Sequence, residues 1–338
     1  MPLTRRPVRI LSTAAALLLS ATLVACTGAP ESTPTPTPSA SATADPDVTP
    51  TPTPEPIPVS DSIDAITVAG EPGSAPEVTI PTPFAVDETR TRTLVEGQAD
   101  VPVAEADSLV EVHYVGVNAR TGEVFDTSWE DGTPRMFQLD QVVPGFTKGL
   151  TGTKAGQRIL IVMPGTDGYD ASGGNPNAGI QVGDSLAFVV DVVTVAAQQA
   201  TGVAETPELP VTLGEADGKP TVTIDSASTP PAELLVAPVI RGAQRPVAAG
   251  EQIMVKYRAW SWKTGELVED KFDNPVAGNL DDTIEAWKQG LVGQPLGSRL
   301  VLVAPPSLGY DKPSQNPPIE AGDTVVYVID LLFSSAQG

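Results

Sequence analysis

The chain has 338 residues, which is typical of about two domains, and carries a formal charge of −22. That charge argues against nucleic acid as a partner, because phosphate binding requires a basic surface. The single cysteine and the single histidine exclude an intramolecular disulfide, a thiolate metal cluster and a histidine-pair zinc site.

The N-terminus has the composition of a secretion signal. Arg5, Arg6 and Arg9 precede an apolar run from Ile10 to Ala25 that contains no acidic residue and no lysine. The run is shorter than the roughly 20 residues that span a bilayer as a permanent helix. We therefore predict that residues 1–25 form a signal peptide.

The signal ends in a sequence that resembles a bacterial lipobox, Leu23-Val24-Ala25-Cys26. Small residues suit the signal peptidase, and the cysteine sulfur would accept a diacylglycerol. Cys26 is the only cysteine of the chain, which favours lipidation over a structural role. Two or more acyl chains give stable anchoring. We thus expect a lipoprotein on the extracytoplasmic face of a bacterial membrane.

A proline-rich segment follows. Residues 27–60 contain ten of the 35 prolines in a Thr-Pro, Ser-Ala and Glu-Pro mixture with almost no large apolar side chain. Such a composition cannot bury enough surface to fold and favours an extended, polyproline-like chain. We predict a disordered tether over residues 26–61.

The rest of the chain is duplicated. Val78–Ile80 recurs as Val222–Ile224, and Gly168–Asp170 recurs as Gly309–Asp311, with an offset of about 140 residues. This period is too long for a solenoid and indicates tandem globular domains.

We expect these domains at residues 62–200 and 205–338. Each copy contains runs rich in β-branched residues, which predict strands. In the first, Val112 and Tyr114 lie on one strand face, whereas His113 lies on the other and is predicted to be a surface or packing residue. The predicted strands are 109–115, 158–163 and 185–190 in the first copy, and 253–257, 300–303 and 325–332 in the second.

Only one short helix is predicted in each copy, Phe146–Leu150 after Pro144 in the first and Ile284–Leu291 in the second. Proline suits a first helical turn, where its missing N–H would be unpaired in any case. An antiparallel sheet curved over one short helix is the expected architecture, in the α+β class.

Five ordered motifs resemble the FKBP-type peptidyl-prolyl isomerases. The resemblance extends from Leu109 to Val195, and it implies an antiparallel half-barrel wrapped round a short helix. The second copy is similar to the same family, but less closely, through Val255–Tyr257, Trp287, Tyr310, Ile319 and Tyr327. The motifs of the first copy are Val112–Tyr114, Gly122–Ser128, Val142–Phe146, Gly168-Tyr169 and Gly179-Ile180 followed by Leu186–Phe188.

The resemblance implies rotation about Xaa-Pro bonds without a cofactor or metal. Rotation has a barrier of roughly 18–20 kcal/mol because it breaks amide resonance, and only tighter binding of the twisted amide is required. Asp126 lies beside the implied pocket, where it would accept a hydrogen bond from Tyr114 or polarise the rotating amide. The implied catalytic residues are Tyr114, Phe125, Asp126, Tyr169 and Phe188, and the implied substrate-binding residues are Val142, Val143, Phe146 and Ile180.

The sequence departs from the family pattern at several positions. Phe146 stands where the family usually has tryptophan, and Arg135 follows Pro134 where an aromatic residue is usual. In the second copy, Val268 and Glu269 match Phe125 and Asp126 of the first. Candidate residues of that second site are Tyr257, Glu269, Trp287, Tyr310 and Tyr327.

The leading hypothesis is a monomeric, lipid-anchored prolyl isomerase that acts on proline-containing unfolded or secreted polypeptides. Two alternatives stay open. A non-catalytic chaperone would keep the aromatic cup to grip proline-containing segments, and a surface lipoprotein would use the fold only as architecture. Taken singly, aromatic residues at alternating strand positions are ordinary core residues, and Asp126 alone is compatible with a turn.

Overall fold

The computed structural model describes residues 57–336. The predicted signal peptide, Cys26 and most of the predicted tether lie outside the described residues. The end of that tether runs beside the first domain, where Val59 forms a β-bridge with Ala85 and the Ser60 amide donates to the Ala85 carbonyl. No helix among residues 57–336 is both long enough and apolar enough to cross a membrane.

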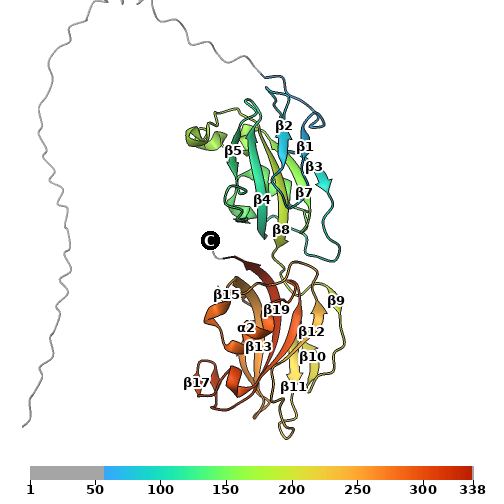
Figure 1. The fold of residues 1–338 in the computed structure, drawn as a ribbon, viewed down its shortest axis with the longest axis vertical. Coiled ribbons are helices and arrows are strands. Elements are labelled where there is room, and N and C mark those ends of the chain that lie inside the picture. The colour runs from blue at the N-terminus through green and yellow to red at the C-terminus, as the bar shows by residue number, and fades with distance from the viewer. Residues whose placement is uncertain (1–56, 337–338) are drawn as a thin grey trace, which may run out of the picture. The chain divides into compact units, whose positions relative to one another are not determined.

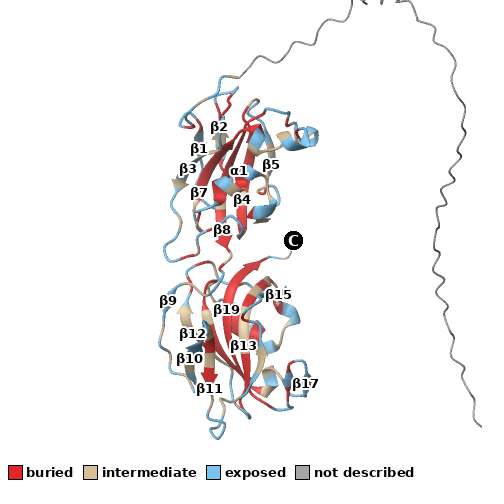
Figure 2. Cartoon of the chain, turned by 180° about the vertical axis from the view of Figure 1, so that it is seen from behind, coloured by how far each residue is buried: buried red, intermediate tan, exposed pale blue. Residues whose placement is uncertain are grey.

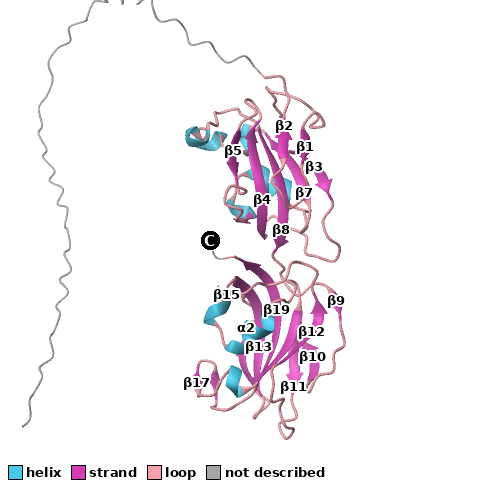
Figure 3. Ribbon diagram, in the orientation of Figure 1, coloured by secondary structure: helices cyan, strands magenta, loops and turns pink. Residues whose placement is uncertain are grey.

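The first domain contains a six-stranded sheet in which neighbouring strands are antiparallel (Figures 1 and 3). The order is β3-β7-β8-β4-β5, and β6 pairs with the other end of β4. The strands are β3 (Arg90–Val95), β4 (Leu109–Asn118), β5 (Val124–Thr127), β6 (Arg135–Gln138), β7 (Arg158–Met163) and β8 (Leu186–Val195).

The second domain repeats this topology with one additional edge strand. Its seven-stranded sheet has the order β14-β13-β19-β16-β12-β9, and β15 pairs with β13 as β6 pairs with β4. The strands are β9 (Val203–Ala204), β12 (Leu235–Arg241), β13 (Gln252–Ser261), β14 (Leu267–Asp270), β15 (Val276–Asn279), β16 (Arg299–Ala304) and β19 (Val325–Ser335).

Each sheet packs against one short α-helix, α1 (Pro144–Leu150) or α2 (Glu285–Leu291). Glycines allow the close approach: a Cβ on Gly145 or Gly149 would collide with Met163 or Ile161 of β7, and one on Gly290 with Leu302 of β16. The predicted strands and helices are confirmed, as is the α+β class. Short 3-10 helices complete the connections: η1 (Leu139–Gln141), η2 (Gly165–Asp167), η3 (Asp170–Ser172), η4 (Pro176–Ala178), η5 (Leu280–Asp282) and η6 (Pro306–Leu308).

A β-hairpin covers the sheet face that points away from the helix in each domain. These hairpins are β1 (Thr67–Ala69) with β2 (Glu77–Thr79), and β10 (Thr212–Ala216) with β11 (Lys219–Thr223). Val68 and Val78 pack on a hydrophobic cluster of the first domain, and Leu213 and Val222 belong to the equivalent cluster of the second. The repeated Val-Thr-Ile sequence is therefore part of a duplicated cover.

Alternation along the central strands produces two cores in each domain. On β8, Phe188 and Val190 face the cluster that contains the helix, whereas Ala187 and Val189 face the cluster beneath the hairpin. The same alternation divides the second domain. Burial on both faces accounts for the long buried stretches along β4, β8 and β19 (Figure 2). A further hairpin, β17 (Ser314–Gln315) with β18 (Pro318–Ile319), lies in the loop before β19.

Candidate functional site

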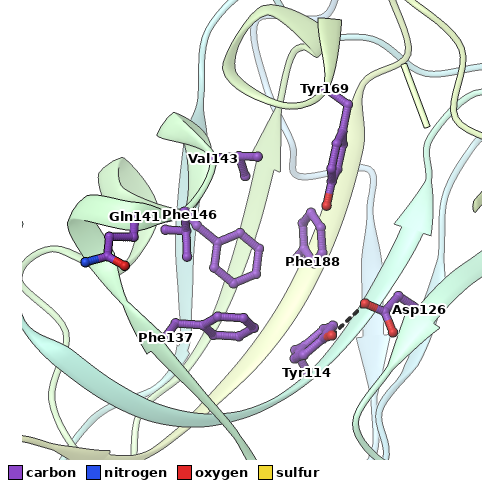
Figure 4. A pocket seen from close by; sticks show the side chains of 9 residues that line it. Tyr114, Asp126, Phe137, Gln141, Val143, Phe146, Tyr169 and Phe188 are labelled. Atoms are coloured by element: carbon purple, nitrogen blue, oxygen red, sulfur yellow. Dashed lines mark hydrogen bonds between the residues drawn. The ribbon is translucent and has the colours of Figure 1, made fainter. Parts of the chain in front are cut away.

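A cavity of about 260 Å³, called here the first cup, lies between the sheet of the first domain and the segment that leads into α1 (Figure 4). Strands β4 and β8 supply its base, and η1 with the start of α1 supplies one wall. Tyr169, between η2 and η3, faces them from the loop after β7. The lining residues are Tyr114, Asp126, Phe137, Gln141, Val142, Val143, Phe146, Tyr169 and Phe188.

Strand register places the two central rings of the first cup. Val110, Val112 and Tyr114 alternate onto the helix side of β4, which confirms the prediction that Val112 and Tyr114 share a face. Phe188 on the neighbouring β8 pairs with Gly116, two residues beyond Tyr114, and so lies on the same face. Both rings are buried, with 7% and 3% exposure. The sheet therefore holds them against the helix.

The rings pack edge to face. Tyr114 and Phe146 have centroids 6.3 Å apart at an interplanar angle of 87°, and Phe146 and Phe188 are 4.7 Å apart at 85°. This arrangement is favoured because the positive edge of one aromatic ring meets the negative face of another. The result is an apolar cup with aromatic walls.

One polar pair stands at the edge of the first cup. The Tyr114 hydroxyl donates a hydrogen bond of 2.6 Å to Asp126 Oδ2, so the bond expected from the sequence is confirmed. Burial, and then this hydrogen bond, raise the pKa of Tyr114. Burial and the Asp126 carboxylate also raise the pKa of Tyr169. Both phenols therefore stay neutral donors at physiological pH.

Seven of the nine predicted first-domain residues line the first cup, and two do not. Phe125 packs against Phe188 at 5.5 Å and 90°, which supports that ring from the side. Ile180 is buried in the helix-side core. Neither belongs to the cavity lining, and the catalytic and binding roles of all nine stay predictions.

The structure adds Phe137 and Gln141, which sequence reasoning missed. Phe137 pairs with Val110 across β6 and β4, and its ring lies 5.5 Å from Phe146. It supplies an aromatic wall two residues after Arg135, and Arg135 is the residue at which the sequence departs from the family pattern. Alternation in Arg135–Gln138 could have found it. Gln141 ends η1, and no comparable pattern marks it.

His113 is a packing residue, as predicted. Its ring stacks on Trp129 with centroids 4.0 Å apart, and its Nδ1 lies 3.0 Å from Ser128 Oγ. Burial lowers the pKa of His113, which favours a neutral imidazole. Its side chain is not part of the first cup.

A second cavity of about 310 Å³, called here the second cup, occupies the equivalent place in the second domain. All five residues predicted for this domain line it. The lining consists of Tyr257, Glu269, Asp282, Thr283, Ile284, Trp287, Tyr310, Asn316, Pro317 and Tyr327. Within residues 57–336, neither cup nor any other place has three or more grouped metal-ligating side chains.

The interplanar angles of the first cup are reproduced in the second, although the distances between ring centroids differ. Tyr257 and Trp287 are 5.0 Å apart at 87°, Trp287 and Tyr327 are 5.6 Å apart at 85°, and Tyr257 and Tyr327 are 6.3 Å apart at 57°. The angles between the matching rings of the first cup are 87°, 85° and 54°. Burial raises the pKa of Tyr257, Tyr310 and Tyr327.

Comparison with known proteins agrees with this duplicated architecture. The model of the FKBP-type peptidyl-prolyl cis-trans isomerase family matches residues 101–193 and 243–332, together more than half of the chain. An FK506-binding protein of Streptomyces anulatus is 41% identical over 122 residues, which cover 36% of this chain and 96% of that protein. A probable FK506-binding protein of Corynebacterium glutamicum is 32% identical over 120 residues, 35% of this chain and 97% of that protein.

Among solved structures, the three FKBP domains of wheat FKBP73 align with 74% of this chain and 96% of their own, at 19% identity and a TM-score of 0.31. This structural alignment does not carry the family assignment. The assignment rests on the match to the family model, on the two FK506-binding proteins and on the geometry of the cups. From these we conclude that the chain belongs to the FKBP-type peptidyl-prolyl cis-trans isomerases and contains two domains of that family.

Proposed function

We propose that the first cup is the isomerase site of this chain. The observation that carries the proposal is the edge-to-face set of Tyr114, Phe146 and Phe188 around a cavity whose only carboxylate is bonded to Tyr114. A prolyl ring packs well on aromatic faces, and the cavity offers room for one residue and its preceding amide.

The chemistry requires only differential binding. The uncatalysed bond exchanges in roughly 10–100 s, and each ~1.36 kcal/mol of preferential stabilisation of the twisted amide accelerates it tenfold. A planar amide is more polar than a twisted one, so an apolar cup destabilises the planar ground state relative to the transition state. Phe146, Phe188 and Val143 supply that environment.

The polar groups orient the substrate. Asp126 accepts from the Tyr114 hydroxyl, which fixes both side chains at the edge of the first cup. The Tyr169 hydroxyl points toward the ring of Phe188 (Figure 4) and is placed to donate to a substrate carbonyl. No proton is transferred in this reaction, so neither group acts as an acid or a base.

The test is cis/trans exchange of a short Xaa-Pro peptide by the full chain. Asp126→Ala leaves the half-buried Tyr114 hydroxyl without its acceptor and is expected to lower the catalysed rate by about tenfold. Glu123→Gln, an exposed change in the β4–β5 turn, is the matched control and is expected to leave the rate unchanged. An Asp126→Ala protein that folds and retains the full rate would overturn the proposed role.

We also propose that the chain is a lipoprotein held on the extracytoplasmic face of the bacterial membrane through Cys26, where it acts on secreted, proline-containing polypeptides. The lipobox, the basic and apolar leader and the proline-rich tether support this location. Cys26→Ser is expected to release the protein from the membrane fraction. Continued membrane association of that variant would contradict lipid anchoring.

A further inference from the structure

The second cup differs from the first most clearly in charge. Two carboxylates line it, Glu269 and Asp282, whereas Asp126 alone lines the first. Asp282 ends η5 as Gln141 ends η1, so a neutral amide of the first domain is replaced by an anion. Asp282 makes no ion pair within 4 Å among residues 57–336.

An arginine beside the first cup, outside its lining, also has no counterpart in the second domain. Arg135 pairs with Val112 across β6 and β4, and the equivalent register pairs Val276 with Val255 across β15 and β13. Arg135 is close enough to lower the pKa of Tyr114. A valine in its place removes this positive charge, which Asp131 pairs at 2.7 Å in the first domain, so the difference in charge between the two cups rests chiefly on Asp282.

A third change opens space. Gly278 stands at the position of Phe137. Phe137 pairs with Val110 of β4, and Gly278 pairs with Ile253, the equivalent residue of β13. A Cβ built on Gly278 meets no atom within 4 Å, so no neighbouring group crowds the point from which the Phe137 side chain extends in the first domain. The second cup has a volume of about 310 Å³, against about 260 Å³ for the first.

The aromatic lining suits a cation. Where the first cup has Phe146 and Phe188, the second has Trp287 and Tyr327, and Tyr257 and Tyr310 complete a ring of four. Tryptophan and tyrosine faces attract ammonium and guanidinium groups more strongly than phenylalanine does. Among residues 57–336, Lys271 forms the ion pair with Glu269, with Nζ 3.8 Å from Oε1, but its side chain is 44% exposed and is not part of the lining.

We propose that the second cup binds a lysine or arginine side chain of a polypeptide. The alkyl stem packs on Trp287 and Tyr327, and the charged head lies toward Glu269 and Asp282. Long basic side chains combine an apolar stem with a charged end, which matches a cavity that is aromatic inside and acidic at its rim. The proposal is independent of isomerase activity in the first cup.

The experiment uses the full chain labelled with ¹⁵N and follows the indole N–H signal of Trp287 by NMR. Trp287→Phe, which restores the residue type of the first domain, assigns that signal. Three blocked tripeptides, Ala-Xaa-Ala with lysine, norleucine or glutamate at the centre, are titrated. None contains proline, so binding at the first cup is not promoted. The lysine peptide is expected to bind about tenfold more tightly than the norleucine peptide, which has a similar stem without the charge.

Charge-neutral variants separate the second cup from the acidic surface in general. Glu269→Gln and Asp282→Asn are each expected to weaken binding of the lysine peptide by about threefold to tenfold. Asp282 is exposed, so that variant tests the site without a risk to folding. Glu233→Gln, another exposed acid of the second domain, is the matched control and is expected to bind as the parent chain does.

The outcomes are distinct. Equal binding of the lysine and norleucine peptides would overturn the proposal and leave an apolar cup. Equal losses of affinity for the lysine peptide in Glu269→Gln and Glu233→Gln would overturn it in favour of diffuse attraction to an acidic protein. An unchanged Trp287 signal at saturating lysine peptide would also overturn it, because the ligand would then not enter the second cup.

Discussion

The two cups share a frame and differ in what lines it. The angles between matching rings agree within 3°, whereas Phe146 and Phe188 are replaced by Trp287 and Tyr327, and Gln141 is replaced by Asp282. Sheet register and the position of one short helix therefore fix where the rings stand. The chemistry offered to a ligand changes at a few positions without disturbing that frame.

A compensated exchange behind the rings shows how the frame tolerates change. In the first domain, a Cβ on Gly116 would lie 2.8 Å from both Phe125 and Phe188, so the glycine makes room for Phe125. The second domain has Ala259 at the position of Gly116 and the smaller Val268 at that of Phe125. The second domain thus has a larger side chain on β13 and a smaller one on the neighbouring β14.

The largest expected effect comes from removing a ring of the first cup. Phe188→Ala deletes a buried ring that contacts Tyr114, Phe125 and Phe146. A loss of about 3–5 kcal/mol in the free energy of unfolding is expected, because a cavity replaces its contacts. Denaturant unfolding measures it. A loss below about 1 kcal/mol would mean that the first cup is not built on this ring.

The next effect tests the compensated exchange. Gly116→Ala alone is expected to destabilise by about 1–3 kcal/mol, because the new methyl displaces Phe125 or Phe188. Adding Phe125→Val, which recreates the pair of the second domain, is expected to recover most of that loss. Unfolding of both single variants and the double variant forms a double-mutant cycle. The compensated exchange would be contradicted if the two single changes in the free energy of unfolding simply added in the double variant.

A smaller effect is expected at the polar edge. Tyr114→Phe keeps the ring and removes the hydroxyl that donates to Asp126. Stability should fall by about 0.5–1.5 kcal/mol, and the exchange rate of an Xaa-Pro peptide by a few-fold. Unfolding and peptide exchange are measured on the same preparation. A rate that falls to background would mean that the hydroxyl itself acts on the amide.

The smallest effect within the physiological range concerns pH. All five tyrosines of the chain line the two cups, and burial is the largest cause of a raised pKa in each. Ionisation therefore opposes folding. The stability that the fold gains from neutral, buried tyrosines is fully present below the unfolded tyrosine pKa of about 10, and it is lost as pH rises above that value.

Tyrosinate absorbance of the folded protein is thus expected to stay flat between about pH 6 and 9 and to rise, together with unfolding, above about pH 10. Far-UV circular dichroism, followed in parallel, reports the unfolding. Phenol ionisation at the ordinary pKa with the fold intact would show that the cups are open to water.

Several parts of this molecule were predictable from sequence. Runs of β-branched residues predict strands because such side chains pack well on a half-buried sheet, and Pro144 marks the start of α1. The ordered motifs place Tyr114, Asp126 and Phe188 together although the first and the last are 74 positions apart. The duplication places the second cup in the same way.

Other parts depend on register and could not be obtained from sequence alone. Irregularities in pairing interrupt β4 between Glu111 and Val112 and again between Gly116 and Val117. Which aromatic residues line the first cup and which support it from behind depends on such details: Phe137 lines the cavity, whereas Phe125 packs behind Phe188. The Val-Thr-Ile repeat is visible in the sequence, but the hairpins to which it belongs and the sheet face that they cover become apparent only in three dimensions.

The central claim is that catalysis belongs to the first cup. The most direct measurement is exchange of an Xaa-Pro peptide by the full chain carrying Asp126→Ala and Phe146→Leu together, with the second cup intact and folding verified by circular dichroism. A rate at the uncatalysed background is expected. A rate close to that of the parent chain would contradict it and would assign the activity to the second domain.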